Sequence, residues 1–484
     1  MPRSSGDAFG SLAGKKQAGP GRNGLTPGIA AGHPATAQAG LEILVEGGTA
    51  ADAAVAACLA SCVAETVMTG LAGGGHALWW DATERRTELL DFFVAVPGLG
   101  GNTRGTELLL LAVPFGTELV HYSVGIASCA VPGVPAGLGA LHQRRGRLPW
   151  ARLVQPAISL AAGGVEMPPA HAACLAMLAP VMTMREGARI YAPGGHLLEA
   201  GAKLEQPGLA AALALLAREG AESLYAGSLA EALLELMGDR GGLVTEADLR
   251  AYRPEWVDPV VGDHAGYRIE TRAGLARVVE TLTDLRPLGG MSEVERVGAL
   301  VAALTETPPD GHTTNLVTVD ETGNACVLTT SLGLGSGDFL PGYDLHLNSM
   351  LGEVDLVVGP LEPGGRMESM MAPALALDHE GPALAIGAAG GTRLRSALVQ
   401  VLTAVLDEGL DPQSAVERPR LHPVGEVVHV EPGFAASALE ALEAEGKSVR
   451  RWPDLHHYFG GVSASGRAGL AADPRRSGSA RGLS

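Results

Sequence analysis

The chain has few aromatic residues, no run of basic residues and no long hydrophobic run. Only 4% of its 484 residues are Phe, Trp or Tyr, and the formal net charge is −18. A surplus of acidic groups argues against nucleic-acid binding, which requires basic stripes. No apolar stretch reaches the roughly 18 to 20 residues that a membrane helix needs. We therefore expect neither a nucleic-acid partner nor a membrane partner.

The five cysteines indicate neither a disulfide framework nor a metal site. Their number is odd and their spacing is scattered. Cys58 and Cys62 lie four residues apart, which places both on one face of a helix. A metal ion would need further ligands close to them, and the neighbouring sequence offers none. We interpret the cysteines as small buried thiols in a reducing compartment, and we expect no metal and no cofactor.

The first 27 residues differ in composition from the rest of the chain. Residues 1–23 are rich in Gly, Ser, Lys and Arg, and they lack the apolar segment of a secretory signal. We expect a disordered lead over residues 1–27 and a cytoplasmic protein.

The remaining sequence predicts a layered α+β architecture. Helical spacing of apolar residues marks 35–46 and 52–64, and helices dominate 168–253. Strand patterns recur throughout, at residues 28–31, 76–81, 88–94, 313–320, 325–331, 383–386, 427–431 and 460–464. Apolar residues make up 46% of the chain, which is enough for a large core. The order of elements predicts a sandwich of two sheets enclosed by helices.

The strand that begins at Thr313 is the most informative segment. Threonine suits strands, so the Thr313-Thr314 pair alone indicates little. A polar Pro-Pro-Asp-Gly segment precedes the strand, and the following hairpin brings Ser331 back beside its start. Later in the chain, Gly390-Gly391 precedes a predicted helix. Such a turn presents backbone N–H groups to an anion, as an oxyanion hole requires.

These features permit one particular chemistry at Thr313. A threonine hydroxyl is a weak nucleophile until a base removes its proton. If Thr313 begins a chain, its own α-amine, with a pKa of about 8, can be that base. The precursor must therefore be cut between His312 and Thr313.

The same segment resembles a known family. The run from His312 to Asp320, with Gly323-Asn324-Ala325 after it, resembles the strand that starts the small subunit of γ-glutamyltransferases, also called glutathione hydrolases. Further segments match that family in the same order, at residues 32–57, 130–133, 146–150 and 241–253. The resemblance covers roughly residues 28–476.

The resemblance implies a fold and a processing event. The fold is the four-layer αββα sandwich of N-terminal-nucleophile (Ntn) hydrolases. Autocatalytic cleavage would give a large subunit, residues 28–312, and a small subunit, residues 313–484. The two subunits come from one precursor and together form one αββα unit, which can assemble further into a homo-oligomer.

Site residues follow from the resemblance by position. Thr313 is the implied nucleophile, and Ser331 replaces a family threonine that hydrogen-bonds it. Gly390 and Gly391 are the implied oxyanion donors. Glu353 stands where the family has the acid that meets a substrate ammonium group.

The positions that bind the glutamyl group depart from the family pattern. Phe93 replaces the arginine that binds the α-carboxylate, and a phenyl ring cannot form that bidentate pair. Ser369 is retained from a pair of carboxylate-binding serines, but the second serine is replaced by Met370. Gly333 replaces an asparagine, and Met350 replaces a Gln or Glu.

The departures predict retained chemistry on a changed substrate. The family's Pro-Pro-Ser-Ser-Gly-Gly loop is also absent, and residues 271–275 stand in its place. We expect an Ntn hydrolase or acyltransferase that acts on a small amide or peptide-like molecule whose recognised end is less polar than a glutamyl group. One alternative is an ordinary glutathione hydrolase in which Arg366 or Arg393 binds the carboxylate. Two others are a specialised-metabolism enzyme, including one that cleaves a carbon–carbon bond, and a non-catalytic scaffold.

Overall fold

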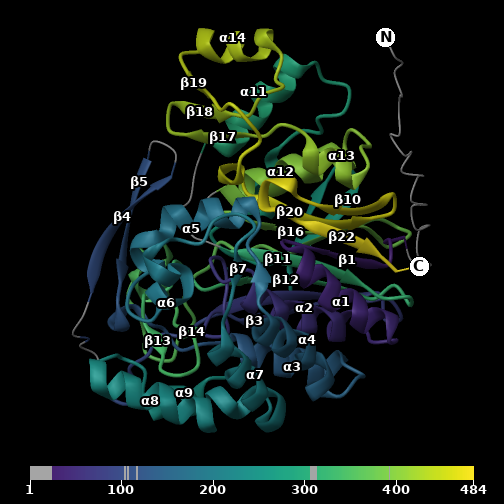
Figure 1. Cartoon of the computed structure of the whole chain (residues 1–484). Coiled ribbons are helices and arrows are strands. Elements are labelled where there is room, and N and C mark those ends of the chain that lie inside the picture. The colour runs from purple at the N-terminus through teal and green to yellow at the C-terminus, as the bar shows by residue number, and fades with distance from the viewer. Residues whose placement is uncertain are drawn as a thin grey trace, which may run out of the picture.

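The computed structural model describes residues 24–102, 105, 108–115, 118–305, 313–391 and 393–483. Within these residues, two large antiparallel sheets lie face to face, and helices cover both outer sides (Figure 1). This arrangement confirms the predicted αββα sandwich.

The first sheet combines strands from both sides of Thr313. In the described chain its order is β22 (Ser479–Gly482), β1 (Gly28–Ala31), β11 (Thr314–Val319), β12 (Ala325–Ser331), β2 (Gly74–Asp81), β3 (Arg86–Phe92) and β8 (Glu255–Val257). Strand β1 pairs with β22 on one edge and with β11 on the other. Strands on both sides of the expected cleavage point therefore hydrogen-bond to one another within one sheet.

The second sheet lies directly above the first. Its order in the described chain is β21 (Gly469–Ala472), β20 (Gly461–Gly466), β16 (Pro382–Ala389), β15 (Ala374–Leu377), β10 (Tyr267–Thr271) and β9 (Val260–His264). The sheets approach closely at Gly387, where a Cβ atom would lie 3.2 Å from Cβ of Asn315. Buried aliphatic side chains such as Val317, Val327 and Leu375 fill the space between the sheets.

The outer layers consist of helices with apolar inner faces. Those packed with the first sheet are α1 (Pro34–Val45), α2 (Ala50–Ala64), α3 (Val134–Arg145), α4 (Trp150–Gly163) and α7 (Pro207–Glu219). Those packed with the second are α10 (Val278–Asp284), α11 (Glu293–Leu304), α12 (Arg393–Leu406), α13 (Pro412–Glu417) and α14 (Ala436–Ala444). Helix α2 is buried over its whole length, because its small side chains let it lie close against β11 and β12. A capping box between Thr49 and Asp52 fixes its start.

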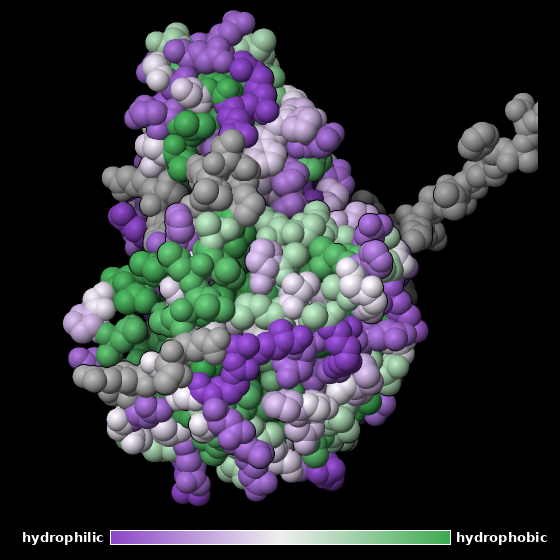
Figure 2. Space-filling view, turned by 60° about the vertical axis from the view of Figure 1, so that its left-hand side comes forward, coloured by the Kyte–Doolittle hydropathy of each residue, from purple (hydrophilic) through white to green (hydrophobic). Residues whose placement is uncertain are grey.

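Smaller elements surround the sandwich. The helices are α5 (Pro169–Met182), α6 (Gly187–Tyr191), α8 (Ser228–Arg240) and α9 (Glu246–Ala251). The strands are β4 (Leu109–Phe115), β5 (Glu118–Val124), β6 (Val165–Glu166), β7 (Lys203–Leu204), β13 (Phe339–Leu340), β14 (Leu345–His346), β17 (Leu421–Val424), β18 (Val427–Val430) and β19 (Ser448–Arg451). Figure 2 shows an apolar face on the side of the β4–β5 hairpin, where Leu110 is 71% exposed. In the described chain no helix combines the length and apolarity needed to cross a membrane.

The sequence prediction of strands was incomplete. It placed the last strands at 427–431 and 460–464, whereas β19, β21 and β22 lie beyond or between them. It also missed β9, β10 and the β4–β5 hairpin. Most of these strands have only four or five residues, which is too short for a clear alternation of apolar and polar side chains.

Candidate active site

Pairing of the strands brings the predicted nucleophile and its partner to one edge of the first sheet. Thr313 immediately precedes β11, and Thr314 pairs with Thr330 of β12. One step further along this antiparallel ladder, Thr313 lies opposite Ser331. Ser331 in turn pairs with Gly74 at the start of β2. The register thus brings Thr313 and Ser331 together, as predicted.

Phe93 continues this row along the same edge. Gly75 pairs with Phe92, so the backbone of Phe93 lies beside Gly74. A Cβ atom on Gly74 would lie 2.9 Å from Cα of Phe93. Neighbouring strands are about 4.8 Å apart, so three steps from Thr313 to Phe93 span roughly 14 Å. Phe93 therefore lies on the same edge of the sheet as Thr313, two strands beyond Ser331.

Glu353 lies against the backbone next to Ser331. The Ser331 Oγ accepts a hydrogen bond of 3.0 Å from the N–H of Gly333. A Cβ atom on Gly333 would lie only 2.2 Å from Oε1 of Glu353. The glycine therefore leaves room for the buried Glu353 carboxylate in space that an asparagine side chain would occupy. Its role toward a substrate ammonium group stays a prediction.

Three of the four positions that depart from the glutamyl-binding pattern meet in one buried apolar cluster. Phe93, Met350 and Met370 are each at most 5% exposed. We call this group the acyl-side cluster; its buried members are Phe93, Val94, Val96, Ala130, Met350, Leu356, Met367, Met370 and Met371. Aliphatic, thioether and aromatic side chains pack against one another here in place of the hydrogen-bonding groups of the family.

Ser369 borders this cluster and contacts an arginine that the sequence analysis did not single out. The Ser369 Oγ accepts a 3.1 Å hydrogen bond from the N–H of Met371, and its carbonyl accepts one of 3.1 Å from Arg272. Arg272 belongs to the segment 271–275 that replaces the family loop. It also pairs at 3.9 Å with Asp91 and at 4.0 Å with Glu368.

The two arginines proposed as alternative carboxylate ligands are engaged with other groups. Arg366 donates a hydrogen bond of 3.1 Å to the carbonyl of Phe93, and its guanidinium lies 4.4 Å from the centre of the Tyr252 ring. Arg393 donates to the carbonyl of Tyr458 and lies over its ring. Arg366 is therefore near the acyl-side cluster, whereas Arg393 is held at the start of α12.

The Gly390-Gly391 turn joins β16 to α12, as predicted. Their φ angles are +138° and +59°, a region of backbone conformation that favours glycine. A Cβ atom on Gly390 would lie 2.7 Å from Cα of Gly460, so a side chain has no space there. Ala389, at the end of β16, lines the same pocket as Thr313. The turn therefore lies at the Thr313 end of the sandwich.

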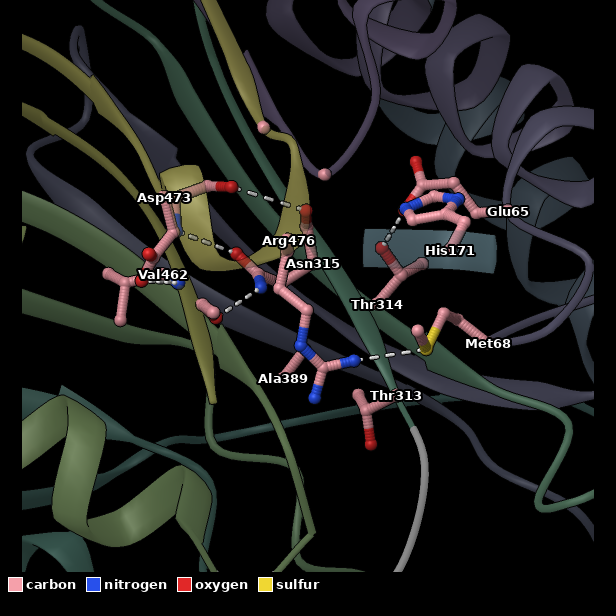
Figure 3. A pocket seen from close by; sticks show the side chains of 14 residues that line it. Glu65, Met68, His171, Thr313, Thr314, Asn315, Ala389, Val462, Asp473 and Arg476 are labelled. Carbon is pink, nitrogen blue, oxygen red and sulfur yellow. Dashed lines mark hydrogen bonds between the residues drawn. The ribbon is translucent and has the colours of Figure 1, made fainter. Parts of the chain in front are cut away.

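A pocket at this end contains titratable groups that the motif analysis missed. Its lining residues are Gly32, Glu65, Met68, His171, Thr313, Thr314, Asn315, Ala389, Gly461, Val462, Ser463, Asp473, Arg476 and Gly478 (Figure 3). Glu65 accepts hydrogen bonds from the hydroxyls of Thr36, at 2.7 Å, and of Thr314. Burial raises the pKa of Glu65 to about 7, against the opposing effect of these two hydrogen bonds. Figure 3 shows the Thr313 hydroxyl pointing away from Glu65.

The missed residues gave only weak signals in the sequence. Glu65 is an acidic residue directly after a helix whose last two turns are mostly apolar, and this is the one available signal. Arg476 and His171 belong to segments without a motif. His312, the other side of the predicted cleavage site, lies outside the described residues.

Comparisons with known proteins identify the family of this chain. The profile of the gamma-glutamyltranspeptidase family matches residues 36–294 and 292–483. An "Acylase ACY 1 proenzyme" of Pseudomonas sp. (strain V22) is 29% identical over 90% of this chain and 89% of its own. A "Glutathione hydrolase proenzyme" of Bacillus subtilis (strain 168) is 25% identical over 84% of this chain and 82% of its own.

A solved structure has the same fold over nearly the whole chain. It is a cephalosporin acylase from Bacillus halodurans, which matches with a TM-score of 0.82 at 24% identity. The match covers 99% of this chain and 100% of that one. The chain belongs to the γ-glutamyltranspeptidase family of Ntn hydrolases and is an enzyme.

Proposed function

We propose that this chain is a self-cleaving acylase with Thr313 as its nucleophile, and that its acyl donor is apolar where a γ-glutamyl donor is charged. The observation that carries the proposal is the convergence of Phe93, Met350 and Met370 in the acyl-side cluster. These three replacements come from two separate parts of the sequence, yet their side chains pack in one apolar cluster.

The reaction needs only groups that the site supplies. Cleavage between His312 and Thr313 frees the α-amine of Thr313. This amine takes the proton of the hydroxyl, whose oxygen attacks the substrate carbonyl. The N–H groups of Gly390 and Gly391 stabilise the oxyanion, and the amine returns the proton to the leaving nitrogen. Water then attacks the ester by the same route and releases the acid.

The apolar character of the acyl-side cluster supports an uncharged acyl group. A carboxylate placed against Phe93 and Met370 would lose its hydration, and the nearby Arg272 and Arg366 already bind other groups. An alkyl or aryl chain in the same place gains about 25 cal/mol for each Å² of apolar surface removed from water. For an alkyl chain of five or six buried carbons this amounts to roughly 4 to 5 kcal/mol, at about 0.8 kcal/mol per buried methylene.

The test compares two chromogenic amides that share a leaving group. We expect the processed protein to release p-nitroaniline from hexanoyl-p-nitroanilide with a kcat/KM at least tenfold above that for γ-glutamyl-p-nitroanilide. Thr313→Ala is the inactive control. Met370→Ser should reduce the preference, because it returns a polar group to the acyl-side cluster. Faster release from the γ-glutamyl compound would contradict the proposal and favour an ordinary glutathione hydrolase in which Arg272 or Arg366 binds the carboxylate.

A further inference from the structure

Within the described part of the chain, Arg476 is a buried cation without a carboxylate partner. Its exposed fraction is 7%, and among the described residues it forms no ion pair. Its Nη1 donates to the sulfur of Met68 at 3.1 Å, and its Nε donates no hydrogen bond to a described residue. Its neighbour Arg475, in contrast, pairs with both Glu431 and Asp473. Burial of a charge without an ion-pair partner is costly, which points to a functional reason for this arginine.

Two glycines place the guanidinium of Arg476 at the catalytic end of the sandwich. A Cβ atom on Gly461 would lie 2.1 Å from Cγ of Arg476, so this glycine makes room for the aliphatic stem. The Nη2 atom lies 3.6 Å from the place of a Cβ on Gly390. Figure 3 shows the guanidinium extending toward the start of β11, in the pocket that Thr313 lines.

Glu65 and Asp473 act on Arg476 through their charges, but neither forms an ion pair with it among the described residues. Asp473 is occupied by Arg420, at 2.6 Å, and by the N–H of Val462, at 3.0 Å. Burial, with the nearby charges of His33 and Arg476, lowers the pKa of His171 to about 3, so the ring is neutral. The remaining titratable groups that act on the pocket are Glu65 on α2, His33 before α1, Cys174 on α5 and Arg393 on α12.

We infer that Arg476 is a positioning residue whose charge keeps the α-amine of processed Thr313 in its neutral, proton-accepting form. The inference rests on the proposed function, since only a cleaved chain has this amine. A free α-amine has a pKa of about 8 and would be mostly protonated at pH 7. A nearby guanidinium disfavours a second positive charge, and burial acts in the same direction. Arg476 thus makes Thr313 a competent base at neutral pH.

The experiment titrates the amine with and without the neighbouring charge. Two neutral variants, Arg476→Met and Arg476→Gln, are compared with the wild type and with Arg476→Lys. The Cα and Cβ shifts of Thr313 in [13C]threonine-labelled, processed protein report its amine directly, assigned with Thr313→Ser. The pH profile of kcat/KM for hexanoyl-p-nitroanilide reports the same group during turnover.

We expect a midpoint below pH 8 in the wild type and a midpoint at least about one pH unit higher in both neutral variants. Below the midpoint, kcat/KM falls about tenfold for each pH unit by which the midpoint rises, whereas the plateau at high pH stays within about twofold. The lysine variant keeps the charge and the wild-type midpoint. A wild-type value of kcat/KM on the plateau at high pH shows that the neutral variants are folded and cleaved. If Arg476→Met is insoluble, Arg476→Gln alone provides the comparison.

Glu65→Gln separates the amine from the other group that titrates near pH 7. The midpoint of Thr313 persists in this variant if it belongs to the amine, and its disappearance would overturn the inference. An unchanged midpoint in Arg476→Met and Arg476→Gln would overturn it as well. Intact-mass analysis distinguishes the two failures. A wild-type chain that is not cut before Thr313 refutes the proposed function, whereas a cut chain with the same midpoint in all variants refutes the role of Arg476 alone.

Discussion

Replacing Glu65 by glutamine changes how the stability of this enzyme depends on pH. The Glu65 carboxyl is 2% exposed and lies between the hydroxyls of Thr36 and Thr314. Burial raises its pKa from 4.5 to about 7, so the folded protein holds this proton at pH values where the unfolded chain has released it. The free energy of unfolding therefore decreases as pH rises from about 4.5 to 7.

The size of this loss follows from the two pKa values of Glu65. They differ by roughly 2.5, and a pKa difference of one corresponds to about 1.36 kcal/mol, so the loss is about 3 kcal/mol. Glutamine has the same shape; its carbonyl accepts from one threonine hydroxyl and its amide donates to the other. It does not ionise, so the variant should lack this part of the pH dependence. With an unfolding entropy of about 2.1 cal/mol/K per residue, 3 kcal/mol corresponds to about 3 °C in Tm for a chain of this size.

Thermal unfolding between pH 5 and pH 8 measures the effect. Both proteins carry Thr313→Ala, so that each unfolds as one uncut chain. Glu445, an exposed residue directly after α14, is replaced by glutamine in a control protein that loses one charge at the surface. We expect the Tm of the Glu65→Gln protein, relative to its parent, to be about 3 °C higher at pH 8 than at pH 5. A difference in Tm that stays constant within 1 °C over this range would refute the interpretation of Glu65 as a buried, titrating carboxyl.

Two further substitutions test the turn and the buried ion-pair network. Gly390→Ala places a side chain at a φ of +138° and against Gly460. We expect kcat to fall about 100-fold while the far-UV circular dichroism spectrum stays unchanged. A variant with the kcat of the wild type would exclude a catalytic role of this turn. Asp473→Asn leaves the buried Arg420 and Arg475 without one of their charge partners, and we expect a loss of about 3 to 5 kcal/mol in urea unfolding. A loss below 1 kcal/mol would contradict the importance of this network.

Local sequence signals predicted the elements that position the nucleophile. Helices α1 and α2, the β2–β3 hairpin, the β11–β12 hairpin and the Gly390-Gly391 turn each have a distinct pattern within a short window. Strand β22 lacks such a signal, because it is an edge strand of four residues whose partner in the described chain, β1, lies more than 440 residues earlier.

The site itself depends on contacts that no local pattern encodes. The hydrogen bond from Thr314 to Glu65 joins residues 249 positions apart, and that from Arg476 to Met68 joins residues 408 apart. The departures from the family pattern identified Phe93 and Met370 as two separate positions. Only the fold shows that they pack in one cluster.

The central claim is that Thr313 becomes the first residue of a chain, and the mass of the purified protein tests it most directly. The account predicts two fragments in the wild type, with the smaller one beginning at Thr313, and a single uncut chain in Thr313→Ala. A wild-type protein that stays intact, or a Thr313→Ala protein cut at the same bond, would contradict it.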